Sequence, residues 1–339
     1  MKVLKPGFCM ALAMLAAAVS GSVRADASEL RIAQQFGISY LPVVVAQENK
    51  LIEKHAKAAG AGDITVRWSY LTGASSMNDA LLSGSLDIGF AGPPGLAVMW
   101  ARTRGSASVR GISSIAAVPL YLVTRNPNVK SIRDLTEKDK IALPAVKVSI
   151  QALLLQMAAA QLFGDANFAK LDPLTISLSH ADAAAAMLSP TSEINAHFTS
   201  PPYNYLEISK ANGRVILTST DVVGGLTTNN LAYATTRFYE ANPKLYAAFL
   251  KSIEEACEII KRNPRAAVDL YLKATKFKGS AEDVENTYRV VEERGTEFSL
   301  TPHGTSKLAD FMFQRGIIKE KIGSWRDLFF PEVHHLPGS

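Results

Sequence analysis

Strand-like and helix-like segments alternate along this chain at short intervals, and this alternation restricts the fold more than any other feature. Residues 30–34 and 64–70 are predicted strands on either side of a predicted helix at residues 43–59. Residues 140–145 and 174–178 repeat the arrangement, again with a helix between them. Strands that alternate with helices in this way are typical of βαβ units. The pattern therefore predicts an α/β fold with mostly parallel sheets flanked by helices.

Two segments of the chain are similar to each other, which indicates an internal repeat. Residues 80–94 read ALLSGSLDIGFAGPP, and residues 186–202 read AMLSPTSEINAHFTSPP. Each contains the end of a helix, a Leu-Ser turn, an acidic residue that opens a strand, and two prolines after it. We interpret the pair as matching parts of two lobes with similar architecture. Coincidence is the alternative, because turns favour Ser, Gly and Pro in any protein.

The first 25 residues have the layout of a secretory signal peptide. Lys2 and Lys5 precede an apolar run at residues 8–19, and Val23-Arg24-Ala25 offers a small-residue cleavage site. The apolar run is shorter than the ~20 residues that a bilayer-spanning helix needs. We therefore expect residues 1–25 to be removed and the mature chain to be exported to the periplasm.

Composition and missing motifs limit the functions of the mature chain. Removal of the predicted signal lowers the formal net charge from +5 to +2, an excess too small to indicate a nucleic-acid partner. Cys257 is then the only cysteine, and its place beside an apolar helical stripe indicates a core residue. His180 and His197 lie near predicted strand ends, where a histidine can bind a ligand or have a structural role. Nucleotide-binding, hydrolase and zinc-binding motifs are absent from the sequence, so we expect no catalytic residue, metal or cofactor.

Small residues precede the predicted helix at residues 77–82. Ser76 and Asp79 fit a capping box at its start, and Gly84 fits a left-handed residue at its end. These assignments leave Thr72-Gly73-Ala74 unexplained. A helix start with few side chains exposes backbone N–H groups and carries partial positive charge, so it can bind an anion. Turn chemistry and an anion site are both compatible with the sequence.

Two helix starts in the second predicted lobe have a similar character. Lys147 and Ser149 follow a predicted strand, and Ser149 is placed to cap the next helix. Ser200 and Tyr203 flank the proline pair that follows a later strand. Ligands of open α/β sheets bind beyond the carboxyl ends of the strands. We therefore expect these loops to converge on one binding site.

Three stretches of the sequence resemble a known protein family. They are the loop at residues 36–42, SSMNDALLSGSLDIGFAGPP and SIRDLTEKDKIALPAVKVSIQ. From about residue 29 to residue 330, the sequence resembles the nitrate/sulfonate/taurine-type periplasmic substrate-binding proteins of ABC importers. The resemblance implies a type II periplasmic-binding-protein fold, in which two crossover strands act as a hinge between two lobes. It places lobe one at residues 26–118 and 226–339, with a helical C-terminal tail, and lobe two at residues 119–225.

The resemblance also implies a ligand site in the cleft between the lobes. Its expected residues are, in chain order, Tyr40, Pro42, Gly73, Ser75, Ser76, Gly92, Pro93, Lys147, Ser149, Gln151, Ser200 and Tyr203. Ser200 and Tyr203 correspond to the family pattern by position only. The chain departs from that pattern at Asn49-Lys50, where a glycine is usual, and at AHFTSPPY, where sulfonate binders commonly have an acidic-aromatic segment.

As a member of this family, the chain would be the periplasmic solute-binding component of an ABC importer. It would capture a small organic anion, such as a sulfonate, a taurine-like compound or an aromatic carboxylate, and deliver it as a monomer to a membrane permease. The permease and its ATPase would be separate chains. One alternative is an enzyme on the same scaffold, similar to the thiamine-pyrimidine synthase or to aromatic sulfinate desulfinases, although both depend on cysteines that this chain lacks at the matching positions. The other alternative is a periplasmic sensor subunit.

Overall fold

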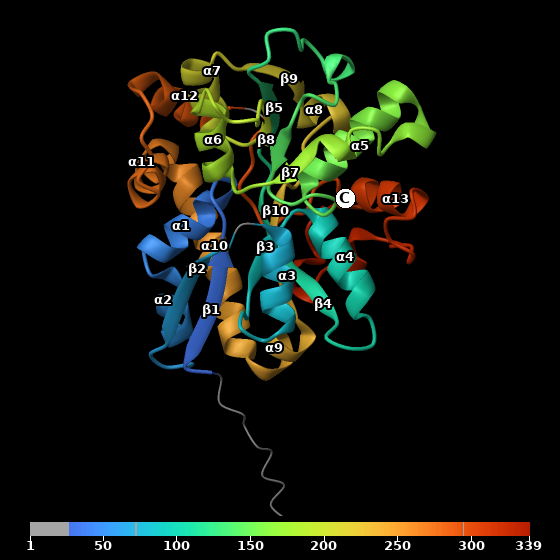
Figure 1. Ribbon diagram of the computed structural model, residues 1–339. Helices are drawn as coiled ribbons and strands as arrows, with labels where there is room; N and C mark the ends of the chain where they lie inside the picture. The colour runs from blue at the N-terminus through green and yellow to red at the C-terminus, as the bar shows by residue number, and fades with distance from the viewer. Residues whose placement is uncertain (1–26, 72, 294) are drawn as a thin grey trace, which may run out of the picture.

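The computed structural model describes residues 27–71, 73–293 and 295–339. The predicted signal peptide at residues 1–25 lies outside the described residues. The described chain is α/β, and its strands and helices form an upper and a lower part in Figure 1. No helix in this part of the chain has the length and apolar character needed to cross a membrane.

The first sheet contains strands from two separate stretches of the chain: β1 (Glu29–Gln34), β2 (Thr65–Tyr70), β3 (Gly89–Ala91) and β4 (Val109–Ala116) from the first, and β10 (Asn230–Thr235) from the second. β1 and β2 pair in parallel, and β10 lies antiparallel between β3 and β4. A parallel bridge between Ile32 and Ile88 joins these two groups of strands. The resulting order is β2-β1-β3-β10-β4.

The second sheet repeats this plan with β5 (Tyr121–Thr124), β6 (Ile141–Leu143), β7 (Thr175–Ser177), β8 (Ala196–Thr199) and β9 (Arg214–Thr218). Its order is β7-β6-β8-β5-β9, and β5 is the antiparallel strand. In each sheet, the fourth strand in this order therefore runs antiparallel to the other four, which all run in one direction. We call the parts of the molecule built on the two sheets the first lobe and the second lobe. The prediction of two lobes with similar α/β architecture is confirmed.

Helices cover both sheets (Figure 1). The first lobe carries α1 (Leu41–Glu48), α2 (Leu51–Ala58), α3 (Ala74–Leu82), α4 (Pro93–Thr103), α9 (Thr236–Ala241) and α10 (Pro243–Arg262). The second lobe carries α5 (Ile150–Phe163), α6 (His180–Leu188), α7 (Tyr203–Ala211) and α8 (Ser219–Val223). The C-terminal tail adds α11 (Pro264–Ala274), α12 (Ala281–Glu292) and α13 (Thr305–Gln314), which pack on α1, α7 and α4 respectively. The tail thus contacts both lobes.

Two predicted helices differ from the observed ones at their ends. The single helix expected at residues 43–59 is divided into α1 and α2, because Lys50 adopts the left-handed conformation with φ of 52°. Helix α3 begins at Ala74, so Ser76 lies inside its first turn and donates a hydrogen bond to the carbonyl of Gly73 instead of capping the helix. The expected left-handed Gly84 follows the end of α3 with φ of 74°. The predicted capping box is therefore wrong.

The C-terminal tail is anchored by apolar packing. The predicted stripe of α10 is buried in the first lobe: Leu245, Phe249, Ile253, Ala256 and Ile260. Cys257 is buried beside it, as expected for a core residue. Near the C-terminus, the backbone N–H of Phe330 donates to the carbonyl of Gly111 in β4, 2.9 Å away. This contact fastens the last described segment to the first sheet.

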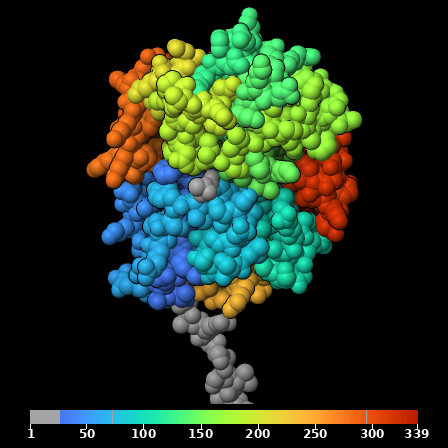
Figure 2. Space-filling model, viewed as in Figure 1, coloured from blue at the N-terminus to red at the C-terminus, as the bar shows by residue number. Residues whose placement is uncertain are grey.

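The lobes are in direct contact. The chain passes from the first lobe to the second between β4 and β5, and it returns between α8 and β10. One hydrophobic cluster includes Leu96 of α4 and Ile150 of α5, so the apolar core continues across the boundary. In Figure 2, the green and yellow residues of the second lobe lie directly above the blue and cyan residues of the first.

Candidate functional site

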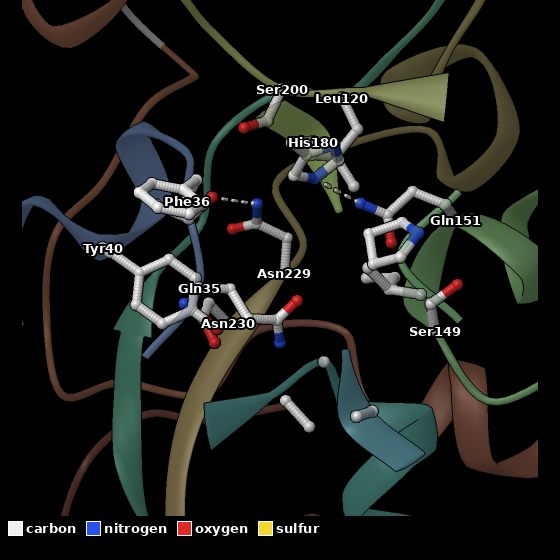
Figure 3. Close-up of a pocket in the computed structure, with 16 residues that line it drawn as sticks. Gln35, Phe36, Tyr40, Leu120, Ser149, Gln151, His180, Ser200, Asn229 and Asn230 are labelled. Atoms are coloured by element: carbon white, nitrogen blue, oxygen red, sulfur yellow. Dashed lines mark hydrogen bonds between the residues drawn. The ribbon is translucent and has the colours of Figure 1, made fainter. Parts of the chain in front are cut away.

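The candidate site is a pocket at the facing edges of the two sheets (Figure 3). Its volume is about 40 Å³. It is lined by Gln35, Phe36, Ser39, Tyr40, Ala74, Ala91, Gly92, Leu120, Pro144, Ser149, Ile150, Gln151, His180, Ser200, Asn229 and Asn230. This volume is the space open to the centres of water-sized groups, and one water molecule needs about 10–15 Å³ by that measure, so the pocket in this arrangement holds only a few such groups.

Strand ends explain why these residues meet. Gln35 follows β1, Gly92 follows β3, Pro144 follows β6 and Ser200 follows β8. The carboxyl ends of parallel strands share one edge of a sheet, and this edge is where open α/β sheets bind ligands. The antiparallel strands bring their first residues to the same edge, which places Asn230 of β10 in the pocket.

Helices α3, α4, α5 and α6 all begin at this pocket, with lining residues at or next to their first positions. Ser149 caps α5, and its side chain accepts a hydrogen bond from the N–H of Ala152. The N–H groups of Ile150 and Gln151 lie in the first turn of α5, where backbone N–H groups have no hydrogen-bond acceptor within the helix. Each helix start also carries about half a positive charge. The pocket is therefore electropositive through its backbone.

Helix α4 contributes to this field but offers few donors. Its first two residues are Pro93 and Pro94, which have no N–H, and the N–H of Gly95 donates to the carbonyl of Gly92. Backbone donors for a ligand therefore come from the starts of α3, α5 and α6.

The polar side chains that line the pocket are uncharged. Among the described residues that line it, none is Asp, Glu, Lys or Arg. Asn229 connects two parts of the site, because its Nδ2 donates to Ser39 Oγ and its Oδ1 accepts from the N–H of Val118. Burial raises the pKa of Tyr40 well above its usual value, so its hydroxyl stays protonated. These groups can bind a ligand through hydrogen bonds without a formal cation.

His180 belongs to a buried row of titratable groups behind the pocket. Its Nδ1 lies 2.8 Å from His197 Nε2, and His197 Nδ1 lies 2.5 Å from Glu207 Oε1. Burial lowers the pKa of His180 well below its usual value and that of His197 to about 3, and it raises the pKa of Glu207. Each shift favours the uncharged form of the group. Because these groups are buried without a counter-charge, burial favours the neutral form of the whole row.

Glycines let the lobes approach each other closely. A Cβ atom at Gly73 would lie 2.3 Å from the carbonyl oxygen of Pro144, and one at Gly92 would lie 2.8 Å from Ile150 Cβ. A Cβ at Gly37 would lie 2.6 Å from Ser200 Oγ. In the same region, the N–H of Ile38 donates across the boundary to the carbonyl of Pro201, 2.8 Å away. Gly73, one of the small residues that the capping assignments leave unexplained, thus makes room for the opposite lobe.

Five of the residues expected from the sequence line the pocket: Tyr40, Gly92, Ser149, Gln151 and Ser200. The other seven are outside the lining. Pro42 and Pro93 are buried in the first turns of α1 and α4, and Ser75 is exposed on α3. Their positions show that a residue next to a helix start can face the core or the solvent instead of the pocket.

The remaining expected residues lie near the pocket but do not face it. The Gly73 backbone contacts Pro144, and the Ser76 hydroxyl is turned back to Gly73. Lys147 has φ of 68° and an exposed side chain. The Tyr203 ring stacks with that of His180 at a centroid distance of 6.2 Å, so it supports the histidine from behind.

Several lining residues were missed by the sequence reasoning. Gln35, Phe36 and Ser39 lie in or beside the loop at residues 36–42, for which the sequence predicts only Tyr40 and Pro42 as site residues. Asn229 precedes β10 and Asn230 is its first residue. The sequence analysis instead places site residues in loops that follow strands. The signal that could have found them is the antiparallel direction of β10, which the sequence pattern does not reveal.

Comparisons with known proteins agree with this architecture. The model of the NMT1-like family matches residues 24–271. The alkanesulfonate-binding protein SsuA from Xanthomonas axonopodis pv. citri, solved with MOPS bound, is similar in structure with a TM-score of 0.67 and 18% sequence identity, over 88% of this chain and 96% of that one. The search of curated proteins found no match.

Two other solved structures have the same fold. The periplasmic aliphatic sulphonate binding protein SsuA from Escherichia coli has a TM-score of 0.62 and 20% identity, over 90% of this chain and 92% of that one. The periplasmic nitrate-binding protein NrtA from Synechocystis PCC 6803 has a TM-score of 0.61 and 16% identity, over 80% of this chain and 74% of that one. The expected periplasmic-binding-protein fold is thus confirmed, and the family match over most of the sequence shows that this chain belongs to the NMT1-like family.

Proposed function

We propose that this chain is the periplasmic solute-binding component of an ABC importer, and that it captures a small organic anion between its lobes. The observation that carries this proposal is the pocket at the lobe boundary, where several helices begin and uncharged polar side chains converge. Such a site stabilises negative charge through N–H donors and helix dipoles. The sulfonate- and nitrate-binding proteins of the same fold support an anion as the ligand class.

The narrow pocket requires the lobes to separate before a ligand can enter. We propose that the crossings near residues 118–120 and 224–226 act as the hinge and that lobe two spans residues 119–225. Closure over the ligand would then remove water and strengthen each hydrogen bond. A permease and an ATPase on separate chains would recognise the closed form, and this chain would act as a monomer after removal of residues 1–25.

Within this site, the lining residues have distinct roles. Backbone N–H groups at Ile150 and Gln151, with the side chains of Asn229 and Asn230, would hold the charged head group. The Phe36 ring, which stacks with Tyr70 at a centroid distance of 4.8 Å, would contact the apolar part of the ligand. We propose no catalytic residue.

A thermal-shift panel on residues 26–339 tests the ligand class. The panel contains methanesulfonate, taurine, nitrate and benzoate, with an uncharged pyrimidine as the comparison compound. A ligand at a hundredfold excess over its dissociation constant adds about 2.7 kcal/mol of stability. Stabilisation by at least one anion and not by the pyrimidine supports the proposal. Stabilisation by the pyrimidine alone, or chemical conversion of a bound compound, contradicts it.

A further inference from the structure

The row formed by His180, His197 and Glu207 connects the pocket with the interior of the second lobe. Only His180 reaches the pocket lining, while His197 and Glu207 are fully buried. The three residues come from α6, β8 and α7, so tertiary packing holds them in line. The proposed binding of an anion does not by itself require a buried carboxyl group two residues behind the pocket.

The hydrogen bonds of the row have a preferred direction. Glu207 Oε1 contacts His197, whereas Glu207 Oε2 is buried and has no hydrogen-bond partner among the described residues. A proton on Oε2 would be an unsatisfied buried donor, whereas a proton on Oε1 can be donated to His197 Nδ1. His197 Nε2–H then donates to His180 Nδ1, which leaves His180 with Nε2–H. The neutral row therefore presents an N–H donor to the pocket.

The neighbours of His180 supply no counter-charge. From α7, the Tyr203 ring stacks against it and Glu207 ends the row, and from β8 only His197 faces it. The packed strand β6 carries no titratable side chain. On α6 itself, Asp182 is engaged with the capping residue Ser179. The Gln151 amide is uncharged, and its Nε2 lies 3.4 Å from His180 Nε2. Because two N–H donors cannot pair, a His180 Nε2–H requires a half-turn of this amide, which exchanges its nitrogen and oxygen and lets Gln151 Oε1 accept.

We propose that an anion bound beside His180 draws positive charge to the pocket by a proton shift along this row. One proton moves from Glu207 Oε1 to His197 Nδ1, and another moves from His197 Nε2 to His180 Nδ1. His180 becomes an imidazolium and Glu207 becomes a carboxylate, while His197 stays neutral. The row keeps the same number of protons and a net charge of zero, so no proton is taken from solvent. This inference rests on the proposed function, because only an anionic ligand favours the shift.

The shift explains how a pocket lined by uncharged side chains can bind an anion. A hydrogen bond from an imidazolium to an anion is stronger than one from a neutral imidazole, by about tenfold in affinity. In the absence of ligand, the neutral row avoids a buried unpaired charge, which would destabilise the protein. The counter-charge therefore exists only while the anion is bound.

Glu207→Gln tests the shift, because glutamine keeps the shape of glutamate but cannot release a proton. Isothermal titration with methanesulfonate is performed in two buffers with different heats of ionisation. For the wild type we expect no net proton uptake and an affinity that is constant between about pH 6 and pH 8. For the variant at pH 8 we expect about tenfold weaker affinity, with proton uptake from the buffer and recovery of affinity as the pH falls. Glu258→Gln, an exposed change on α10, should match the wild type.

Equal affinity of wild type and Glu207→Gln across this pH range, or proton uptake by the wild type, overturns the proposal. Infrared spectra provide a measurement without ligand: the free wild type should show the band of a protonated buried carboxyl group, and Glu207→Gln should lack it. Absence of that band in the wild type overturns the neutral resting row even if methanesulfonate binds. If the wild type shows this band but binds no anion of the panel, the proposed function is contradicted and the neutral resting row is not. If the variant does not fold, ¹⁵N spectra of His180 in the wild type decide, because both ring nitrogens should become protonated when methanesulfonate is added.

Discussion

A single methyl group at Gly73 should hold the two lobes apart. The φ of Gly73 is 178°, an extended conformation that alanine adopts without strain. In the closed arrangement, however, the new Cβ would lie 2.3 Å from the carbonyl oxygen of Pro144. Ordinary contacts begin at 3.4 Å, so the lobes must separate by about 1 Å at this point. Gly73→Ala therefore disfavours the closed form specifically.

The magnitude follows from the energetics of overpacking. Insertion of a methyl group into a well-packed contact costs about 1–3 kcal/mol. Because the clash exists only in the closed form, this cost lowers the population that can bind, and the apparent affinity for an anion falls by about 5- to 150-fold. The free energy of unfolding should change less, since separated lobes relieve the clash and only a helix N-cap is altered.

Titration calorimetry with the panel compounds measures the affinity, and small-angle X-ray scattering measures the lobe separation. Ser75→Ala is the matched control, because Ser75 is exposed in the same helical turn and lies outside the pocket lining. We expect Gly73→Ala to bind more weakly and to have a larger radius of gyration, and Ser75→Ala to match the wild type. Wild-type affinity and an unchanged radius for Gly73→Ala would refute the argument that close backbone contact limits closure.

Three other changes test separate features. Lys147→Ala should leave the affinity for methanesulfonate within about twofold of the wild-type value, because the side chain is exposed and lies outside the pocket lining. Titration calorimetry measures this affinity, and a tenfold loss would place Lys147 in the site. Ser149→Ala should lower the free energy of unfolding by about 1 kcal/mol in urea titrations, because α5 loses its cap; an unchanged midpoint would contradict that role. Burial alone would raise the pKa of Asp139, but hydrogen bonds from groups that include the Thr136 N–H and Asn126 Nδ2 outweigh it and lower the pKa. The stability that the Asp139 carboxylate provides is thus present above about pH 4 and lost as the pH falls further. Asp139→Asn should therefore be less stable than the wild type at pH 7, and the difference in the free energy of unfolding should shrink at pH 3. Chemical unfolding at the two pH values measures this difference.

Local sequence patterns were sufficient to predict most elements of this protein. The alternating strands, the apolar stripe of α10 and the start of α5 at Ser149 all depend on residues that are close together in the chain. The ends of α3 and α1 were less predictable. A serine can cap a helix or lie in its first turn with little change in local energy, and Lys50 can adopt a conformation that glycine adopts more easily.

The candidate site was predicted only in part, for a geometric reason. The sequence indicated which loops follow strands, and five of its selected residues line the pocket. The entry of Asn229 and Asn230 depends on the direction of β10, which is decided by pairing with strands more than a hundred residues earlier.

The sequence by itself determined the order of strands and helices, the two similar lobes and the small residues at the helix starts, because periodicity and backbone freedom are local properties. Tertiary structure decided that Gly73 contacts Pro144 and that His180, His197 and Glu207 form one buried row. These contacts join segments of different elements, and burial changes the charge of a group only after those elements have packed around it.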